Sequence, residues 1–173
     1  MLGRTFSVLK EPTVTVLGLG NILMTDEGVG VKSVLEFERR YQVPDYVEIV
    51  DGGSAGLDLI PFIEGREKVL MVDAVNFDRE PGYIDILEND AIPARITEKA
   101  SMHHLGLMDV LSIVRMSGNV PKELCLIGIQ PKSLELGIDM TREMCDKVDS
   151  LIERVVAKLR EWNIPCVLRS PQK

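Results

Sequence analysis

The sequence predicts an α/β fold, a three-layer sandwich in which helices cover both faces of a mostly parallel, twisted sheet of about five strands. Short apolar segments rich in β-branched residues alternate along the chain with longer segments whose apolar residues recur at helical spacing. The apolar segments are also unbroken, as is typical of strands buried on both faces. A length of 173 residues suits one domain over 1–173, with a core over 13–162 and terminal extensions over 1–10 and 165–173.

The first half of the chain contains three expected strands and two expected helices. The strands are residues 13–19 (TVTVLGL), 47–50 and 68–75 (KVLMVDAV). A helix over 27–41 carries apolar residues on one side and charges on the other, and it must stop before Pro44. A second, shorter helix is expected over 57–63. This order of elements is that of parallel strands joined by helical crossovers.

The second half continues the alternation. Residues 83–87 follow a turn-like segment and are expected to form a strand at the edge of the sheet. A helix over 104–116 precedes a strand over 124–129. Residues 141–162 predict the longest helix, because one apolar stripe runs through it from Met144 to Trp162. The chain from Ile164 onward is expected to be a surface tail.

Composition excludes several classes of function. Twenty basic against 27 acidic side chains give a net charge of −7, so nucleic acid is not expected as a partner. No apolar segment approaches the roughly 20 residues that span a bilayer, and no signal peptide is recognisable. The three cysteines form no CxxC pair and indicate reduced thiols. We therefore expect a cytoplasmic protein, a monomer, with no membrane partner.

Polar side chains follow several of the expected strands. Because the carboxyl ends of parallel strands meet at one edge of a sheet, these side chains are expected to converge there. The only histidines are adjacent and come just before a helix, so any imidazole chemistry belongs to that place. The converging set is Glu27 or Asp26, Asp51, Asp73 and one of His103 and His104. Two carboxylates and an imidazole suit a divalent ion such as nickel or zinc.

Each of these side chains also has an ordinary structural interpretation. Asp26 or Glu27 can complement the positive end of the first helix, and Asp51 before two glycines can shape a turn. Asp73 is harder to explain in this way, because it interrupts an apolar strand and is costly to bury unpaired. The convergence of all of them on one edge favours a functional site.

Dinucleotide binding is an alternative interpretation. Gly18 and Gly20 follow a strand as in the Rossmann fingerprint, but Leu23 stands where the third glycine belongs and the helix begins too late. The HExxH, GxSxG and P-loop motifs do not occur. Zincin, α/β-hydrolase and nucleotide-phosphate chemistry are therefore not expected.

Four segments together resemble the NiFe-hydrogenase maturation endopeptidases. They are GLGNILMTDEGVGV, DGGSAG, VDAV and SMHHLGL, in the order and at the spacing of that family, and the resemblance covers about 13–162. It implies a phosphorylase/hydrolase-like fold. It also implies an endopeptidase that removes a short C-terminal peptide from the hydrogenase large-subunit precursor after nickel has been installed.

The resemblance carries roles onto single residues. It implies that Glu27, Asp73 and His103 are the metal-binding and catalytic side chains, although His104 remains an alternative to His103. It links Asp51, with Gly52 and Gly53, to substrate recognition. The metal is expected to be nickel supplied by the substrate, and another divalent ion is expected to be able to take its place in vitro. A non-catalytic metal-dependent assembly factor or chaperone is the alternative from a different class.

The resemblance also implies that the metal is used for recognition. The substrate's nickel, already held by substrate thiolates, would complete its coordination with the two carboxylates and the imidazole, so that an empty precursor is not gripped. A water activated by the metal or by one carboxylate is the expected nucleophile. Thiol catalysis by Cys125, Cys145 or Cys166 is not expected, because none lies beside a histidine or near the expected edge.

Overall fold

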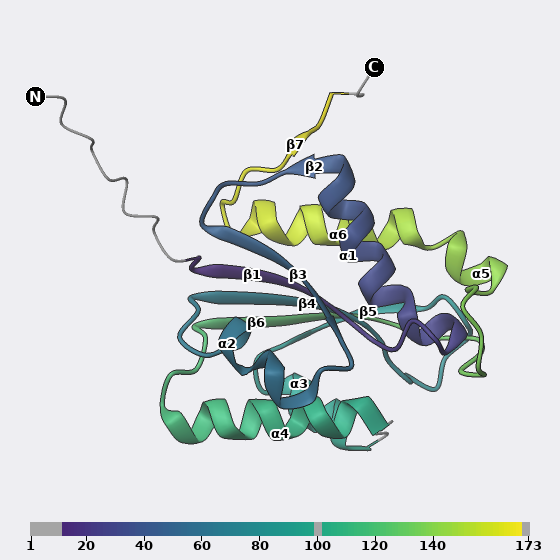
Figure 1. Cartoon of the computed structure of the whole chain (residues 1–173), viewed down its shortest axis with the longest axis horizontal. Coiled ribbons are helices and arrows are strands. Elements are labelled where there is room, and N and C mark those ends of the chain that lie inside the picture. Colours follow the sequence, from purple (N-terminus) through teal and green to yellow (C-terminus); the bar gives the residue numbers. More distant parts are fainter. Residues whose placement is uncertain (1–11, 99–101, 171–173) are drawn as a thin grey trace, which may run out of the picture.

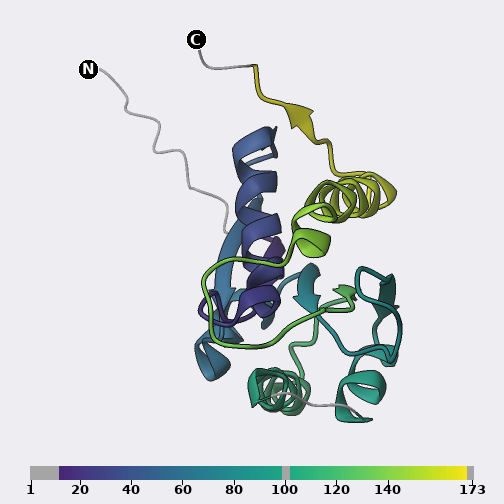
Figure 2. The same cartoon turned by 90° about the vertical axis from the view of Figure 1, so that its right-hand side faces the viewer.

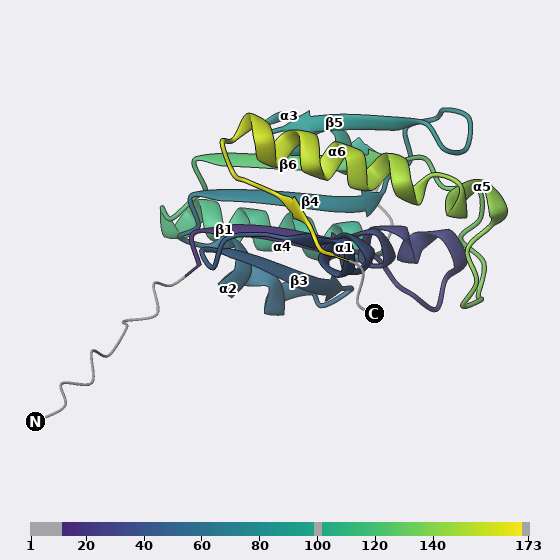
Figure 3. The ribbon, with the colours of Figure 1, turned by 90° about the horizontal axis from the view of Figure 1, so that it is seen from above.

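The computed structural model describes residues 12–98 and 102–170, and its centre is a five-stranded sheet. The strand order is β3-β1-β4-β6-β5, which can be followed from above (Figure 3). The strands are β1 (Val14–Leu19), β3 (Val47–Gly53), β4 (Lys68–Ala74), β5 (Ile84–Glu88) and β6 (Glu123–Ile129). The first four in the spatial order are parallel, and β5 pairs antiparallel with β6 at the edge. The predicted mostly parallel sheet and its edge strand are confirmed.

Helices cover both faces of the sheet, as predicted (Figures 1 and 2). One face carries α1 (Val29–Arg40) and α6 (Val148–Glu161). The other carries α2 (Ile60–Ile63), α3 (Ala91–Glu98) and α4 (Met102–Ser117). The short helical turns are η1 (Thr25–Gly28), η2 (Gly56–Leu59) and α5 (Arg142–Cys145). Within the described residues, no helix combines the length and apolar character needed to cross a bilayer.

Alternation along the strands builds two hydrophobic clusters, one on each face. In β4, Leu70 and Val72 pack in the cluster beneath α1 and α6, whereas Val69 and Met71 pack in the cluster beneath α4. The same division holds along β1 and β6. By this two-residue period, Asp73 lies on the α4 face of the sheet.

The prediction of one long helix over 141–162 is wrong. The segment forms α5 and α6, which are separated at Asp146 and Lys147, and α4 with 16 residues is the longest helix in the described part of the chain. The backbone at both separating residues stays in the right-handed helical region. The apolar stripe therefore keeps its phase across the break, and periodicity cannot reveal it.

The expected surface tail is also wrong in part. Ile164 is buried in the core, and the next residues form β7 (Val167–Leu168), which pairs antiparallel with β2 (Tyr41–Gln42). The Arg169 side chain holds this two-stranded ribbon to the end of α1 by donating from Nε to the carbonyl oxygens of Glu38 and Tyr41. The helix expected over 27–41 begins later than predicted, at Val29, because η1 precedes it.

Candidate active site

Three of the predicted acidic side chains lie at the carboxyl edge of the sheet, to the right in Figure 1. Glu27 lies in η1, which follows β1 and contacts β4. Asp73 is the penultimate residue of β4, and Asp51 pairs in register with Gly18 near the end of β1. The side chains of Glu27 and Asp73 are both buried. The topology therefore brings together residues that lie up to 46 positions apart in the chain.

Two glycines allow Glu27 to approach the sheet this closely. A Cβ atom on Gly20 would lie 1.7 Å from the carbonyl oxygen of Glu27, and the φ of Gly20 is +118°. A Cβ on Gly30 would lie 2.2 Å from the carbonyl oxygen of Val72, the residue before Asp73. The glycines of this loop thus serve to place η1 and the first turn of α1 against β1 and β4.

The structure separates the roles of Asp26 and Glu27, which the sequence leaves open. The Asp26 carboxylate is fully buried and accepts four hydrogen bonds. Oδ2 accepts from the amides of Lys132 and Ser133 and from the Thr141 hydroxyl, all at 3.0 Å, and Oδ1 accepts from the Thr141 amide at 2.7 Å. Asp26 is committed to fastening the 132–141 loop, which leaves Glu27 as the acidic side chain of η1 for chemistry.

Sequence reasoning missed this partner loop. Residues 132–141 connect β6 to α5 and lie against the loop that carries Glu27, as Figures 1 and 2 show. Besides the Asp26 bonds, Thr25 donates from its hydroxyl to the Ser133 carbonyl oxygen at 2.8 Å. The segment has turn-forming residues but no motif, so the sequence carries no signal for this contact. The contact is recognised only in the structure, where Asp26 is fully buried beside Glu27.

Asp51 occupies the turn that its two following glycines predict. Its Oδ1 accepts a hydrogen bond from the Gly53 amide at 3.1 Å, and Gly53 has a φ of +47°. The Gly53 carbonyl oxygen in turn accepts from the Gly20 amide at 2.9 Å, which ties this turn to the glycine-rich loop. The ordinary interpretation of Asp51 as a turn-forming residue is confirmed, and its exposed side chain lies at the same edge as Glu27.

His103 and His104 lie within the first turn of α4 rather than ahead of it, because α4 begins at Met102. Their side chains lie outside the described part of the structure, so the choice between them stays a prediction. The start of α4 packs on η2, where a Cβ on Gly106 would lie 3.3 Å from the Cα of Gly56. This contact brings the first turn of α4 beside the turn after β3, on the face of the sheet that carries Asp73.

A complete metal-binding group is not visible in the described part of the chain. Among the side chains that the structure describes, no three of the histidine, cysteine, aspartate or glutamate type gather closely enough to hold an ion. The predicted set of Glu27, Asp73 and His103 includes one side chain outside that part. Its two carboxylates lie on adjoining elements, as the prediction requires.

The thiols match their expected structural roles. Cys125 lies in β6 within the core, and burial raises the pKa of its thiol to about 12. It is therefore protonated at neutral pH and is not a nucleophile. Burial also raises the pKa of Cys166, and Cys145 is exposed in α5, on a different element from the predicted ligands.

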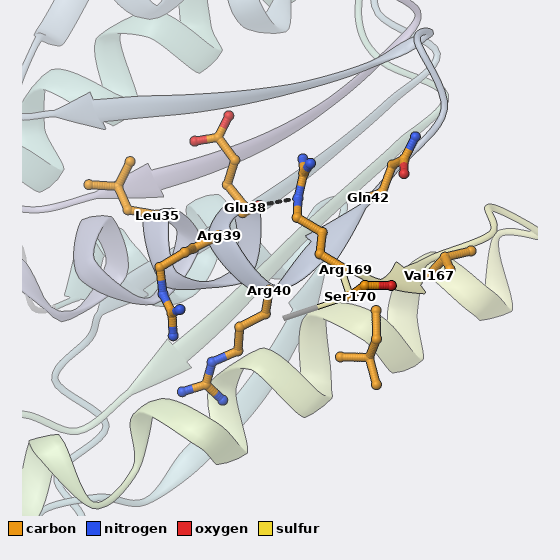
Figure 4. Close-up of a pocket in the computed structure, with 9 residues that line it drawn as sticks. Leu35, Glu38, Arg39, Arg40, Gln42, Val167, Arg169 and Ser170 are labelled. Atoms are coloured by element: carbon orange, nitrogen blue, oxygen red, sulfur yellow. Dashed lines mark hydrogen bonds between the residues drawn. The ribbon is translucent and has the colours of Figure 1, made fainter. Parts of the chain in front are cut away.

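A separate groove lies away from this edge (Figure 4). It has a volume of about 1190 Å³ and is formed where α1 ends beside the β2–β7 ribbon. Because α1 begins beside η1 and has 12 residues, its far end is about 18 Å from the acidic edge. The lining residues are Leu35, Glu38, Arg39, Arg40, Gln42, Val167, Leu168, Arg169 and Ser170.

Comparison with known proteins gives a consistent result. Residues 31–158 match the family model of the hydrogenase maturation proteases. The chain is 44% identical to the hydrogenase 2 maturation protease of Escherichia coli over 157 residues, which are 90% of this chain and 96% of that protein. It is 41% identical to the hydrogenase expression/formation protein HupD of Bradyrhizobium diazoefficiens, covering 93% of this chain and 85% of that one.

Solved structures agree in fold. The chain superposes on the hydrogenase maturating endopeptidase HybD of E. coli with a TM-score of 0.87 and 43% identity, covering 90% of this chain and 97% of that chain. The [NiFe] hydrogenase maturation protease HybD of Thermococcus kodakarensis gives a TM-score of 0.68 at 25% identity, covering 84% and 97%.

Proposed function

Because the chain belongs to the family of hydrogenase maturation proteases, we propose that it removes the C-terminal peptide of a NiFe-hydrogenase large-subunit precursor once that precursor holds nickel. The observation that carries the proposal is the pair of buried carboxylates, Glu27 and Asp73, on adjoining elements at the carboxyl edge. Carboxylate oxygens are suitable ligands for a divalent cation. A metal carried by the substrate is such a cation.

Nickel recognition is proposed to use Glu27, Asp73 and His103. Carboxylate oxygens and an imidazole nitrogen are suitable ligands for this ion, and the substrate's own thiolates provide the rest of its coordination. A precursor without nickel offers these three side chains nothing to bind. Cleavage then depends on metal loading through a difference in affinity between the two forms of the substrate.

The peptide segment is proposed to lie along the turn after β3. Asp51 uses one carboxylate oxygen to shape the turn, which leaves the other for a substrate donor. Gly53, which is partly exposed, has no side chain to obstruct a peptide backbone there. Gly52 is buried, and its lack of a side chain lets the turn pack against Leu17. This turn adjoins the glycine-rich loop, so a bound peptide would lie next to Glu27.

Water is the proposed nucleophile. One of the two carboxylates accepts its proton, or the substrate's nickel lowers the pKa of the water, and the hydroxide attacks the scissile carbonyl carbon. The peptide nitrogen leaves with a proton as the free amine. The protonated, buried Cys125 takes no part in this reaction.

Substitution of the predicted ligands tests the proposal. Asp73→Asn or His103→Ala is expected to reduce processing of nickel-loaded precursor more than about 100-fold, because each removes a ligand that contacts the metal directly. The measurement is the mass change of the precursor's C-terminus after incubation, with circular dichroism to confirm that each variant is folded.

His104→Ala is the matched control and is expected to process the precursor normally. Normal processing by Asp73→Asn, or by both histidine variants, would contradict the proposal. A loss confined to His104→Ala would move the imidazole role to the neighbouring histidine.

A further inference from the structure

Two neighbouring loops at the carboxyl edge expose a group of aliphatic side chains. Leu136 is 87% exposed, Ile138 68% and Leu23 57%. In a described surface where most exposed side chains are polar, these stand together rather than singly. We call this group the rim patch, and its members are Ile22, Leu23, Leu134, Leu136 and Ile138.

The rim patch is built on a fastened framework. Met24 and Gly137 form a parallel bridge, in which the Thr25 amide donates to the Gly137 carbonyl oxygen at 2.7 Å. The Gly137 amide donates to the Leu23 carbonyl oxygen at 2.9 Å. Asp26 fastens both ends of the 132–141 loop with one buried carboxylate. The 132–141 loop, which carries most of the rim patch, is therefore held in place at its middle and at both ends.

The patch adjoins the proposed site. Leu23 precedes Glu27 by four residues, and Ile138 lies beside Gly137, which pairs with the same loop. Both loops lie at the right-hand end of the molecule in Figures 1 and 3, where the strands end. A substrate that presents a metal to Glu27 must bring its surface against this patch.

We propose that the rim patch docks the folded body of the hydrogenase large-subunit precursor, next to the C-terminal peptide that is cleaved. This inference rests on the proposed function. Continuity with the site selects the precursor over other occupants, because a metal held inside a folded protein can reach Glu27 only if that protein covers the adjoining loops.

The charged side chains beside the rim patch indicate which groups the complementary surface of the precursor carries. Glu135 and Asp139 are exposed and alternate with the aliphatic residues of the patch, whereas Lys132 of the same loop is paired with Glu143. Lys32 of α1 also borders the patch and donates to the Ile138 carbonyl oxygen at 2.7 Å. The occupant is therefore an apolar surface that carries Lys or Arg side chains opposite Glu135 and Asp139. Binding through the patch is independent of the metal, whereas binding through Glu27 requires it.

Binding measurements separate these two contributions. The variant is the double substitution Leu136→Ser with Ile138→Ser, and the probes are purified large-subunit precursor with and without nickel. The matched control is Met116→Ser, which changes a side chain that is also 87% exposed but lies near the end of α4, at the opposite edge of the sheet. Glu27→Gln is measured in parallel, and melting temperatures check that all variants are folded.

The double variant is expected to raise the Kd at least 10-fold for both forms of the precursor by a similar factor, and Met116→Ser to leave it unchanged. Glu27→Gln is expected to raise the Kd of the nickel-loaded form alone. An unchanged Kd for the double variant would overturn the patch proposal, as would an effect that only accompanies loss of a homodimer in sedimentation.

The two proposals fail in different ways. If the unsubstituted protein binds both forms of the precursor equally, nickel recognition is wrong, while the effect of the double variant still decides the role of the patch. If it binds neither form, both proposals are wrong.

Discussion

Adjacent carboxylates in η1 have opposite roles at the residue scale. Asp26 is surrounded by donors from the 132–141 loop, so its charge is used within the fold. Glu27, the next residue, lies in the turn that packs on β4, the strand of Asp73. Sequence alone cannot tell which of two neighbouring acids is structural, because the donors come from more than 100 positions away in the chain.

Replacing Asp26 with asparagine is expected to destabilise the protein by about 3 kcal/mol. An amide has one acceptor oxygen, so its NH₂ group must face backbone or hydroxyl donors on the other side, and buried donors are left unpaired. Urea unfolding of Asp26→Asn measures the change. Asp139→Asn, an exposed aspartate of the same loop, is the control and should stay within about 0.5 kcal/mol of the unsubstituted protein. Equal effects of both substitutions would show that Asp26 does not fasten the loop.

At the scale of elements, the glycine-rich loop depends on close backbone contact. Gly20→Ala would place a methyl group 1.7 Å from the Glu27 carbonyl oxygen at a φ of +118°, so the backbone that carries Glu27 must move. We expect a loss of about 3–5 kcal/mol of stability together with loss of processing. Calorimetry and the precursor mass assay measure the two effects.

Gly65→Ala is the matched control for this loop. Gly65 also has a positive φ, +71°, but an added Cβ would meet nothing within 4 Å. Only backbone strain of about 1–2 kcal/mol is expected, with processing intact. If Gly20→Ala behaves like Gly65→Ala, close approach to Glu27 is not what the glycine provides.

The helices and strands show which features of the fold the sequence pattern can predict and which it cannot. Buried strands such as β1 and β4 are readable because short, unbroken apolar segments rich in β-branched residues are typical of parallel sheets covered on both faces. The division into α5 and α6 cannot be read from the pattern, because Asp146 and Lys147 keep helical backbone angles. Nor can β7 and its partner β2 be read from the pattern, because strands of two residues each are too short to show a period.

The candidate site, too, can be predicted from the sequence only in part. The convergence of Glu27, Asp51 and Asp73 follows from parallel topology, which strand–helix alternation already predicts. The position of the 132–141 loop cannot be predicted from this topology. It is set by hydrogen bonds to the Asp26 carboxylate and by the backbone bridge between Met24 and Gly137. Roles for single side chains rest on resemblance to a family, and they stay predictions until the substitutions above are measured.

On the scale of the whole molecule, the two ends of the sheet differ. The carboxyl edge carries the buried carboxylates, the turn after β3 and the rim patch. The β2–β7 ribbon closes the far end of α1, beside the groove in Figure 4. At this end Arg40 forms ion pairs with Glu36 and with Asp149, and the second of these links α1 to α6. The ribbon therefore joins elements that are already linked. We infer that this end contributes stability and that the carboxyl edge carries function.

Ending the chain at Cys166 tests this division. The truncation removes β7 and the Arg169 hydrogen bonds to Arg40, Glu38 and Tyr41, but little buried apolar surface, because Val167 and Leu168 are mostly exposed. The expected loss is about 1–2 kcal/mol, or about 3–6 °C in melting temperature, with precursor processing unchanged below that temperature. Arg169→Ala should give an intermediate loss of stability, because it keeps the strand but removes its side-chain bonds. If the truncated protein stays folded and yet fails to process the precursor, the ribbon end contacts the substrate, and function is not confined to the carboxyl edge.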